Sequence, residues 1–192
     1  MLRIIKTFLS IALFGGALMS QAEADDKVAL FETNHGNFVV ETYSDKAPIT
    51  VKNFVSLISD SFYDGLIFHR VIPDFVVQAG GHEADMKPRE APTEIHNESD
   101  NGLLNTERTL SMARTSDPHS ASSQFFVNLK HNTHLDHRPN QWGYAVFAKV
   151  IGGWDVIKSI EVTETSQSVP REPVVINKAS MVDREDVTDL LD

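Results

Sequence analysis

The sequence predicts a mainly β fold, either a closed antiparallel barrel or a sandwich of two sheets. Many short apolar runs separated by turn residues are typical of strands. Only two stretches have the three- and four-residue apolar spacing of an amphipathic helix. A closed barrel would remove the exposed edges of so many strands. On these observations alone, both architectures remain open.

A cleaved signal peptide is predicted over residues 1–24. Two basic residues, Arg3 and Lys6, precede a short apolar run, and residues 22–24 have the small-x-small form of a signal-peptidase site. The apolar run is shorter than the ~20 residues of a membrane-spanning helix, although an uncleaved anchor is the alternative. We expect a mature chain that starts at Asp25 and works in a bacterial periplasm, or is secreted beyond it.

The mature chain is acidic and contains no cysteine. Loss of two basic residues and one acidic residue with the signal segment moves the formal net charge from −10 to −11. Sequence-independent binding of nucleic acid is disfavoured, because it needs Lys and Arg to neutralise phosphates. Without cysteine there is neither a disulfide framework nor thiol chemistry, so the core must supply the stability. No apolar stripe is left unexplained, and we expect a monomer that makes no membrane contact after cleavage.

The first part of the mature chain predicts a hairpin, a helix and two further strands. Residues 28–32 and 38–42 alternate around the turn at 34–37, which is a hairpin pattern. An early proline, Pro48, then opens a helix with one apolar face. Two strands flank the turn at Pro73.

The second part predicts an irregular region, four strands and a second short helix. The irregular region, 81–102, carries prolines and many charges, and the helix follows Gly153 with apolar residues at three-residue spacing. The globular domain is expected to span 25–182, and the acidic end, 183–192, is predicted to be a frayed tail. The strands predicted in this part are 103–114, 124–129, 144–150 and 173–176.

The most specific motif lies at residues 68–81, which read FHRVIPDFVVQAGG. It places a fixed cation, several large apolar side chains and one neutral amide on what is expected to be strand, without a nucleophile. Together with SQFFVN at 123–128, it resembles the active-site pattern of the cyclophilins, the peptidyl-prolyl cis-trans isomerases. The resemblance covers about 28–179, nearly the whole mature chain.

The resemblance implies both an architecture and an activity. Cyclophilins are closed eight-stranded antiparallel barrels capped at each end by an α-helix, so it decides between barrel and sandwich. The implied activity is the cis-trans isomerisation of X-Pro bonds in proline-containing, unfolded or partly folded polypeptides, during the folding of exported proteins. Neither a cofactor nor a metal is implied. The alternative is a holdase chaperone that binds proline-containing segments with little turnover.

Arg70 is the expected catalytic residue. The rotation barrier of ~18–20 kcal/mol comes from amide resonance, and the twisted state leaves the prolyl nitrogen a better hydrogen-bond acceptor. A donor aimed at that nitrogen favours the transition state. Guanidinium suits this role because it stays charged and presents several N–H groups. Taken alone, Arg70 could equally be a surface arginine paired with a carboxylate. Within the motif it matches the family's catalytic arginine.

The substrate-binding residues follow from the same match. Gln78 and Gln124 are neutral amides that a peptide backbone could satisfy, although structural glutamines are the alternative. Ala113 and Arg114 match a segment whose backbone pairs with the substrate. Since strict alternation would turn Phe75 away from the pocket, a bend near Pro73-Asp74 is implied. The expected pocket walls, each of which could equally be core, are Phe75, Val76, Phe126 and Leu135.

Three positions depart from the eukaryotic pattern of the family. His134 stands where those members carry tryptophan, Tyr144 where they carry histidine, and Arg114 where they carry asparagine. Because the tryptophan contacts cyclosporin, we expect weak binding of that drug. The changes at Tyr144 and Arg114 resemble the bacterial periplasmic branch, which agrees with the signal peptide.

The sequence does not favour two other kinds of site, a metal site and a hydrolase or nucleotide site. His131, His134 and His137 have H-x-x-H-x-x-H spacing with His119 nearby, and such imidazoles could bind zinc or nickel. Composition favours a solvated loop there, with no helix to align the rings. Neither a G-x-S-x-G hydrolase elbow nor a P-loop occurs in the sequence.

Overall fold

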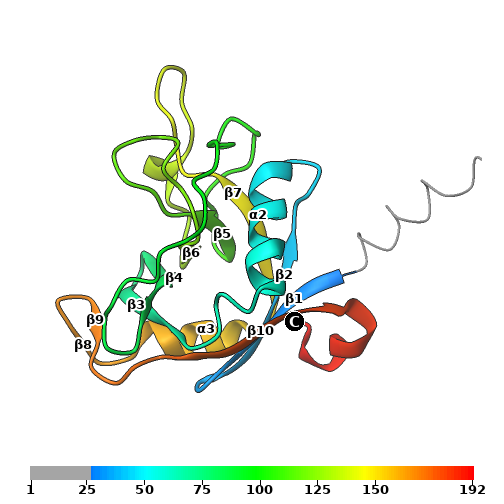
Figure 1. The fold of residues 1–192 in the computed structure, drawn as a ribbon, viewed down its shortest axis with the longest axis vertical. Helices are drawn as coiled ribbons and strands as arrows, with labels where there is room; N and C mark the ends of the chain where they lie inside the picture. Colours follow the sequence, from blue (N-terminus) through cyan, green and yellow to red (C-terminus); the bar gives the residue numbers. More distant parts are fainter. Residues whose placement is uncertain (1–26) are drawn as a thin grey trace, which may run out of the picture.

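A single curled antiparallel sheet forms the body of the molecule (Figure 1). The computed structural model describes residues 27–192, so the predicted signal peptide lies outside the described residues. The eight strands run in the order β10-β1-β2-β7-β5-β6-β4-β3. They are β1 (Lys27–Thr33), β2 (Gly36–Thr42), β3 (Leu66–Ile72), β4 (Val76–Glu83), β5 (Thr109–Met112), β6 (Phe125–Asn128), β7 (Val146–Gly152) and β10 (Ile176–Asp183).

The sheet does not close into a barrel, so the prediction of a closed barrel is wrong, whereas the mainly β class and the eight strands are confirmed. In residues 27–192, its end strands β3 and β10 form no ladder; the isolated bridge Ile67–Val175 lies between them. The Phe68 amide also donates to the Val174 carbonyl at 2.9 Å. The residues that bond to β3, Val174 and Val175, come directly after Pro173. Proline has no N–H to donate to a ladder.

Within the described residues, two α-helices accompany the sheet, α2 (Pro48–Ser59) and α3 (Trp154–Glu161), both where the sequence predicts them. Pro48 occupies the first turn of α2, and Phe54 on its apolar face is fully buried. Gly153 precedes α3 with φ +71°, and a Cβ there would lie 2.3 Å from the Asn37 carbonyl oxygen. None of the helices in residues 27–192 is long and apolar enough to cross a bilayer.

The core is rich in aromatic side chains packed inside the curl of the sheet. Phe31 stacks on Phe38 with ring centroids 4.9 Å apart, and Phe54 meets Phe147 edge-on at 5.0 Å. Tyr63 is fully buried and its hydroxyl donates to the Ser123 carbonyl at 3.0 Å, so the burial leaves no unpaired donor there.

Several predicted element boundaries shift. The strand predicted at 103–114 is confined to β5, and the closing strand predicted at 173–176 begins only at Ile176 and runs on as β10. The short strands β8 (Thr165–Ser166) and β9 (Val169–Pro170) form a separate hairpin that was not predicted. Two 3-10 helices, η1 (Thr133–Leu135) and η2 (Arg184–Leu190), complete the described chain.

The C-terminal segment is docked rather than frayed, which corrects the prediction for 183–192. Val187 in η2 is 3% exposed and packs with Val28 and Val39 of the first two strands. Asp192 forms an ion pair with Arg108 at 2.5 Å, and its amide donates to the Ile151 carbonyl at 3.0 Å. Apolar contact and backbone bonding together hold this end on the sheet.

Candidate active site

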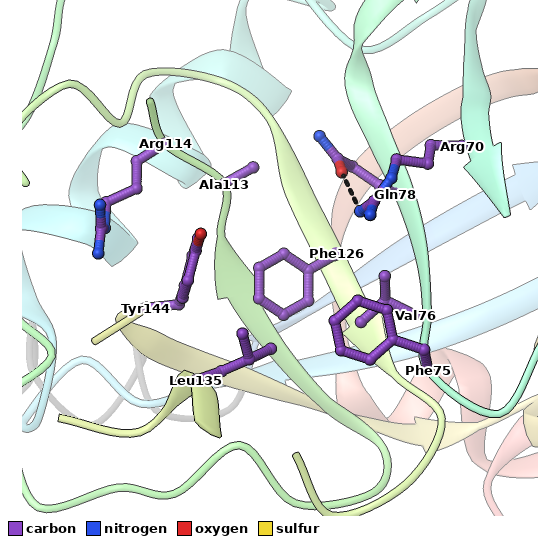
Figure 2. A pocket seen from close by; sticks show the side chains of 9 residues that line it. All are labelled: Arg70, Phe75, Val76, Gln78, Ala113, Arg114, Phe126, Leu135 and Tyr144. Carbon is purple, nitrogen blue, oxygen red and sulfur yellow. Dashed lines mark hydrogen bonds between the residues drawn. The ribbon is translucent and has the colours of Figure 1, made fainter. Parts of the chain in front are cut away.

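A cavity of about 190 Å³ opens where the β3–β4 turn, β6 and two loops meet (Figure 2). Sites for drug-sized ligands measure ~300–1,000 Å³, so this cavity suits one side chain rather than a cofactor. Nine of the residues predicted to form the site line it. They are Arg70, Phe75, Val76, Gln78, Ala113, Arg114, Phe126, Leu135 and Tyr144.

The apolar floor of the cavity is separate from the main core. Val76, Phe126 and Leu135 form a cluster of their own, with exposed fractions of 1%, 4% and 9%. Val77 and Phe125, on the opposite faces of the same two strands, belong to the main core. Alternation along β4 and β6 therefore divides the apolar residues between core and pocket, as the sequence predicts.

Phe75 reaches the pocket because the chain bends, which confirms the bend implied at Pro73-Asp74. Asp74 has φ +55°, and the Phe75 amide donates back to the Ile72 carbonyl at 3.1 Å. This turn between β3 and β4 directs the Phe75 ring toward Phe126 and Val76 (Figure 2).

The Arg70 guanidinium lies at the edge of the cavity and is held by neutral amides. Its Nη1 donates to Gln78 Oε1 at 3.2 Å, and Gln78 Nε2 donates to Gln124 Oε1 at 2.9 Å (Figure 2 draws the first bond). Its Cζ lies 5.9 Å from the Phe75 ring centroid. None of the ion pairs within residues 27–192 involves Arg70. The surface-arginine alternative therefore has no support, and the positive charge stays available.

Strand register explains why these polar side chains meet. Arg70 on β3 is paired with Gln78 on β4, and Gln78 is paired with Phe126 on β6. Cross-strand partners share one face of a sheet. Residues of three neighbouring strands thus line one side of the cavity.

Gln124 lies beside the cavity rather than in its lining. It lines a neighbouring groove that shares Gln78, Ala113 and Arg114 with the first cavity. A Cβ at Gly81 would fall 2.4 Å from Gln124 Cδ, so only glycine there lets the amide lie across β4. Gln124 contacts the site through its bond to Gln78, and its role in substrate binding stays a prediction.

Arg114 holds the loop that carries Tyr144. Its guanidinium donates to the carbonyls of Thr115, Trp142 and Gly143 at 2.9, 3.0 and 3.2 Å. Its Cζ lies 4.6 Å from the Tyr144 ring centroid. These bonds direct its charge toward protein carbonyls and fix the Tyr144 ring against Phe126, at a centroid distance of 5.6 Å.

His134 lies outside the cavity lining, although Leu135 next to it lines the wall. The exposed His134 ring stacks on Phe75 with centroids 5.4 Å apart. His131 approaches Asp136 at 3.9 Å, whereas His137 packs on Trp142. In residues 27–192, no group of three or more His, Cys, Asp or Glu side chains is placed to hold a metal ion.

His69 is a buried histidine next to the site, and sequence reasoning gave it no role. It is 8% exposed, and its ring centroid lies 4.3 Å from that of His82. Burial, then the nearby charges of His82 and Arg70, lower the pKa of His69 to about 4, although contacts with the Ile67 backbone and the Gln124 amide act in the opposite direction. The His69 ring, which lies beside Arg70 in the sequence, is therefore neutral at neutral pH. Its place next to Arg70 in the motif was the available signal.

Two further buried polar residues were missed, and both hold the β3–β4 turn. Asn132 Nδ2 donates to the Phe75 carbonyl at 3.0 Å, and Glu161 Oε1 accepts from the Asp74 amide at 2.9 Å. No motif marks Glu161, since it lies 87 residues downstream of Asp74.

Comparison with known proteins agrees with this geometry. A family model for the cyclophilin type peptidyl-prolyl cis-trans isomerases matches residues 28–181. A peptidyl-prolyl cis-trans isomerase of Acinetobacter baylyi is 48% identical over 167 residues, 84% of this chain and 89% of the relative. Isomerase B of Escherichia coli is 46% identical over 159 residues, 79% of this chain and 97% of the relative. Isomerase A of Dickeya dadantii is 43% identical over 183 residues, 93% and 95% of the two chains.

A solved structure shares the fold. It is a cyclophilin type peptidyl-prolyl cis-trans isomerase of Cryptosporidium parvum, determined in the presence of the dipeptide Ala-Pro. It superposes with a TM-score of 0.69 at 24% identity and covers 81% of this chain and 99% of its own. The family match, the relatives and the proline-sized cavity beside an arginine agree: this chain belongs to the cyclophilin family and is a cyclophilin-type peptidyl-prolyl cis-trans isomerase.

Proposed function

We propose that this isomerase accelerates X-Pro isomerisation in exported proteins while they fold in the periplasm. The support is the signal-peptide pattern at residues 1–24, with its basic start, apolar run and small-x-small end. Departures at Arg114 and Tyr144 that resemble the periplasmic branch point the same way. Uncatalysed exchange takes tens to hundreds of seconds, roughly, which is slow enough to limit folding.

The cavity is proposed to receive the proline ring of an extended substrate. Phe75, Phe126 and Leu135 offer apolar walls, and the volume of about 190 Å³ suits one ring. The substrate backbone on either side would then meet Gln78, Ala113 and the neighbouring groove at Gln124. Binding of this kind fixes the proline while the preceding carbonyl turns.

Arg70 is proposed to donate to the prolyl nitrogen in the twisted state. The observation that supports this role is the position of the guanidinium: Gln78 holds it at the cavity edge, and within residues 27–192 it pairs with no carboxylate. Neutral amides orient the charge without cancelling it. The prolyl nitrogen gains lone-pair density only as conjugation is lost, so the donated bond strengthens in the transition state.

The test is catalysis of cis-to-trans exchange in a short X-Pro peptide by the chain from Asp25. Arg70→Ala should lower kcat/KM roughly 100-fold, the loss typical of one transition-state donor. Arg171→Ala removes an arginine from an exposed ion pair with Glu164 and serves as the control, with no loss expected. Full activity in folded Arg70→Ala would reject the role of Arg70.

The holdase alternative is not favoured, because the family and the named relatives are isomerases. The wild-type assay separates the two functions, since a holdase would bind the peptide without accelerating exchange.

The export proposal has its own test: intact mass of the protein recovered from a periplasmic fraction should correspond to a chain starting at Asp25. An uncleaved chain in the cytoplasmic fraction would reject it.

A further inference from the structure

The turn that carries Phe75 is held from both sides by groups outside it. At the C-terminal end of the turn, the Phe75 carbonyl accepts from the Leu129 amide and from Asn132 Nδ2, each at 3.0 Å. Within the turn, the Asp74 amide donates to Glu161 Oε1 at 2.9 Å. Phe75 is thereby fixed by bonds to the peptide group that follows it and to the peptide group between Pro73 and Asp74.

The turn needs such support because its backbone is not relaxed. Asp74 has φ +55°, in the left-handed region that costs a residue with a Cβ roughly 1 kcal/mol. Pro73 and Asp74 are both exposed, so packing on their side chains contributes little. A fixed acceptor for the Asp74 amide stabilises this conformation over its alternatives.

Glu161 is a buried carboxylate with no role in the chemistry described above. It is 4% exposed, ends α3, and forms an ion pair with Lys158 three residues earlier. Burial alone would raise the pKa of Glu161, but its bonds to Lys158 and to the Asp74 amide outweigh burial and lower it. The group is an ionised acceptor, and a charge-assisted bond to a backbone N–H is stronger than a neutral one.

We propose that Glu161 is a positioning residue of the proline pocket: it fixes the β3–β4 turn so that the Phe75 ring stays in place against the bound proline. This inference rests on the isomerase activity of the pocket. α3 runs beside β3 and β4, so the carboxylate reaches the turn without touching the substrate (Figure 1). Arg70 lies on β3, outside the turn, and keeps its own bond to Gln78.

The consequence is a specific kinetic signature. Releasing the turn lets the Phe75 ring leave the cavity in the free enzyme, so substrate must re-order it on binding. Loss of the bond should raise KM about tenfold, the size expected for one charge-assisted hydrogen bond acting indirectly. kcat should change less than threefold, roughly, because the Arg70 donor is unchanged.

The test uses Glu161→Met, which keeps side-chain length and burial but removes the acceptor. The variant leaves no buried charge unpaired, because Lys158, the ion-pair partner of Glu161, has a side chain that is 46% exposed. Thermal melting checks the fold. Glu161→Gln keeps an acceptor oxygen and should restore KM to within about twofold of wild type. Asp64→Ala is the matched control: it removes a carboxylate that accepts the Ala179 amide at 2.9 Å, on elements outside the pocket lining, and should leave KM unchanged.

A double-mutant cycle with Phe75→Ala then shows whether Glu161 acts through Phe75. If it does, Glu161→Met should have almost no further effect on kcat/KM in the Phe75→Ala background. An unchanged KM in Glu161→Met, or an undiminished effect without Phe75, overturns the inference while wild-type catalysis leaves the isomerase intact. A wild type that fails to catalyse exchange would instead remove the activity on which the inference rests.

Discussion

The proposed role of Arg70 depends on the groups around its guanidinium as well as on the guanidinium itself. Its guanidinium is oriented by Gln78, which is oriented by Gln124, and all of these partners are uncharged. A carboxylate in the same place would hold the guanidinium equally well but would offset its charge at the prolyl nitrogen.

Gln78→Glu tests whether the uncharged partner of Arg70 matters for catalysis. The new carboxylate would stand about where Gln78 Oε1 now accepts from Arg70 at 3.2 Å, so kcat/KM should fall at least tenfold, as roughly 1.4 kcal/mol of lost stabilisation implies. Gln141→Glu adds the same charge at an exposed loop position and should leave kcat/KM unchanged. Peptide isomerisation kinetics measure both, and equal activities would contradict the electrostatic account.

His69 predicts a dependence of stability on pH. Its pKa falls from about 6.5 to about 4 on folding, so between these values the unfolded chain binds more protons than the native one. Stability from this group is complete above pH 6.5 and is lost as the pH falls toward 4, by at most about 3 kcal/mol. Urea unfolding at pH 7 and pH 5 should show a smaller difference for His69→Gln than for wild type.

His82→Phe provides the companion measurement. It removes one of the charges that disfavour protonated His69, so the pH dependence of stability should shrink in part. A slope that is the same in all three proteins would mean that His69 does not titrate as the structure implies.

Weak cyclosporin inhibition is the expected consequence of His134. Its exposed ring stacks on Phe75 at the edge of the cavity, where the eukaryotic pattern carries a larger indole. His134→Trp should strengthen cyclosporin inhibition at least tenfold, because more apolar area is buried against the drug. Inhibition assays on the same peptide measure this, and tight inhibition of the wild type would contradict it.

At the scale of single residues, the sequence predicted what the motif contains and missed what long-range contacts add. Arg70, Gln78 and Phe126 could be found because they lie in two short segments with distinctive residue types. Glu161 and Asn132 could not, since their importance comes from bonds to the β3–β4 turn that only the folded chain creates.

At the scale of elements, η2 is an amphipathic segment whose many acidic residues made its apolar face hard to recognise in the sequence. Acidic residues dominate 183–192 and suggested a frayed tail, yet Val187, Leu190 and Leu191 pack on the first two strands and β7. Apolar residues at three- and four-residue spacing were present in the sequence, but the run is too short for periodicity alone to decide.

Val187→Asp should therefore destabilise the protein by about 3 kcal/mol, because it buries an unpaired charge among Val28 and Val39. Asp189→Ala, at an exposed position of the same helix, should change the free energy of unfolding by less than about 0.5 kcal/mol. Denaturant unfolding measures both. Equal stabilities would mean that this end does not pack on the sheet in solution.

At the scale of the whole molecule, the sheet supports two apolar clusters with different tasks. The aromatic cluster inside the curl holds the fold, whereas the small cluster of Val76, Phe126 and Leu135 faces outward and forms the cavity floor. Because side chains alternate between the two faces of a strand, the sequence alone could assign apolar residues to the core or to the cavity floor. Alternation does not predict whether the sheet closes. Closure depends on the backbone bonds between β3 and the residues after Pro173, and few of these form.

Arg70 is proposed to lower the barrier to rotation of a proline already bound in the cavity. The direct measurement is the cis-trans exchange rate of a saturating X-Pro peptide on the enzyme, by NMR exchange spectroscopy, for wild type and Arg70→Ala. We predict that the variant still binds the peptide, with Kd within about threefold, while on-enzyme exchange falls roughly 100-fold. Exchange on the variant that is as fast as on wild type would contradict this role of Arg70.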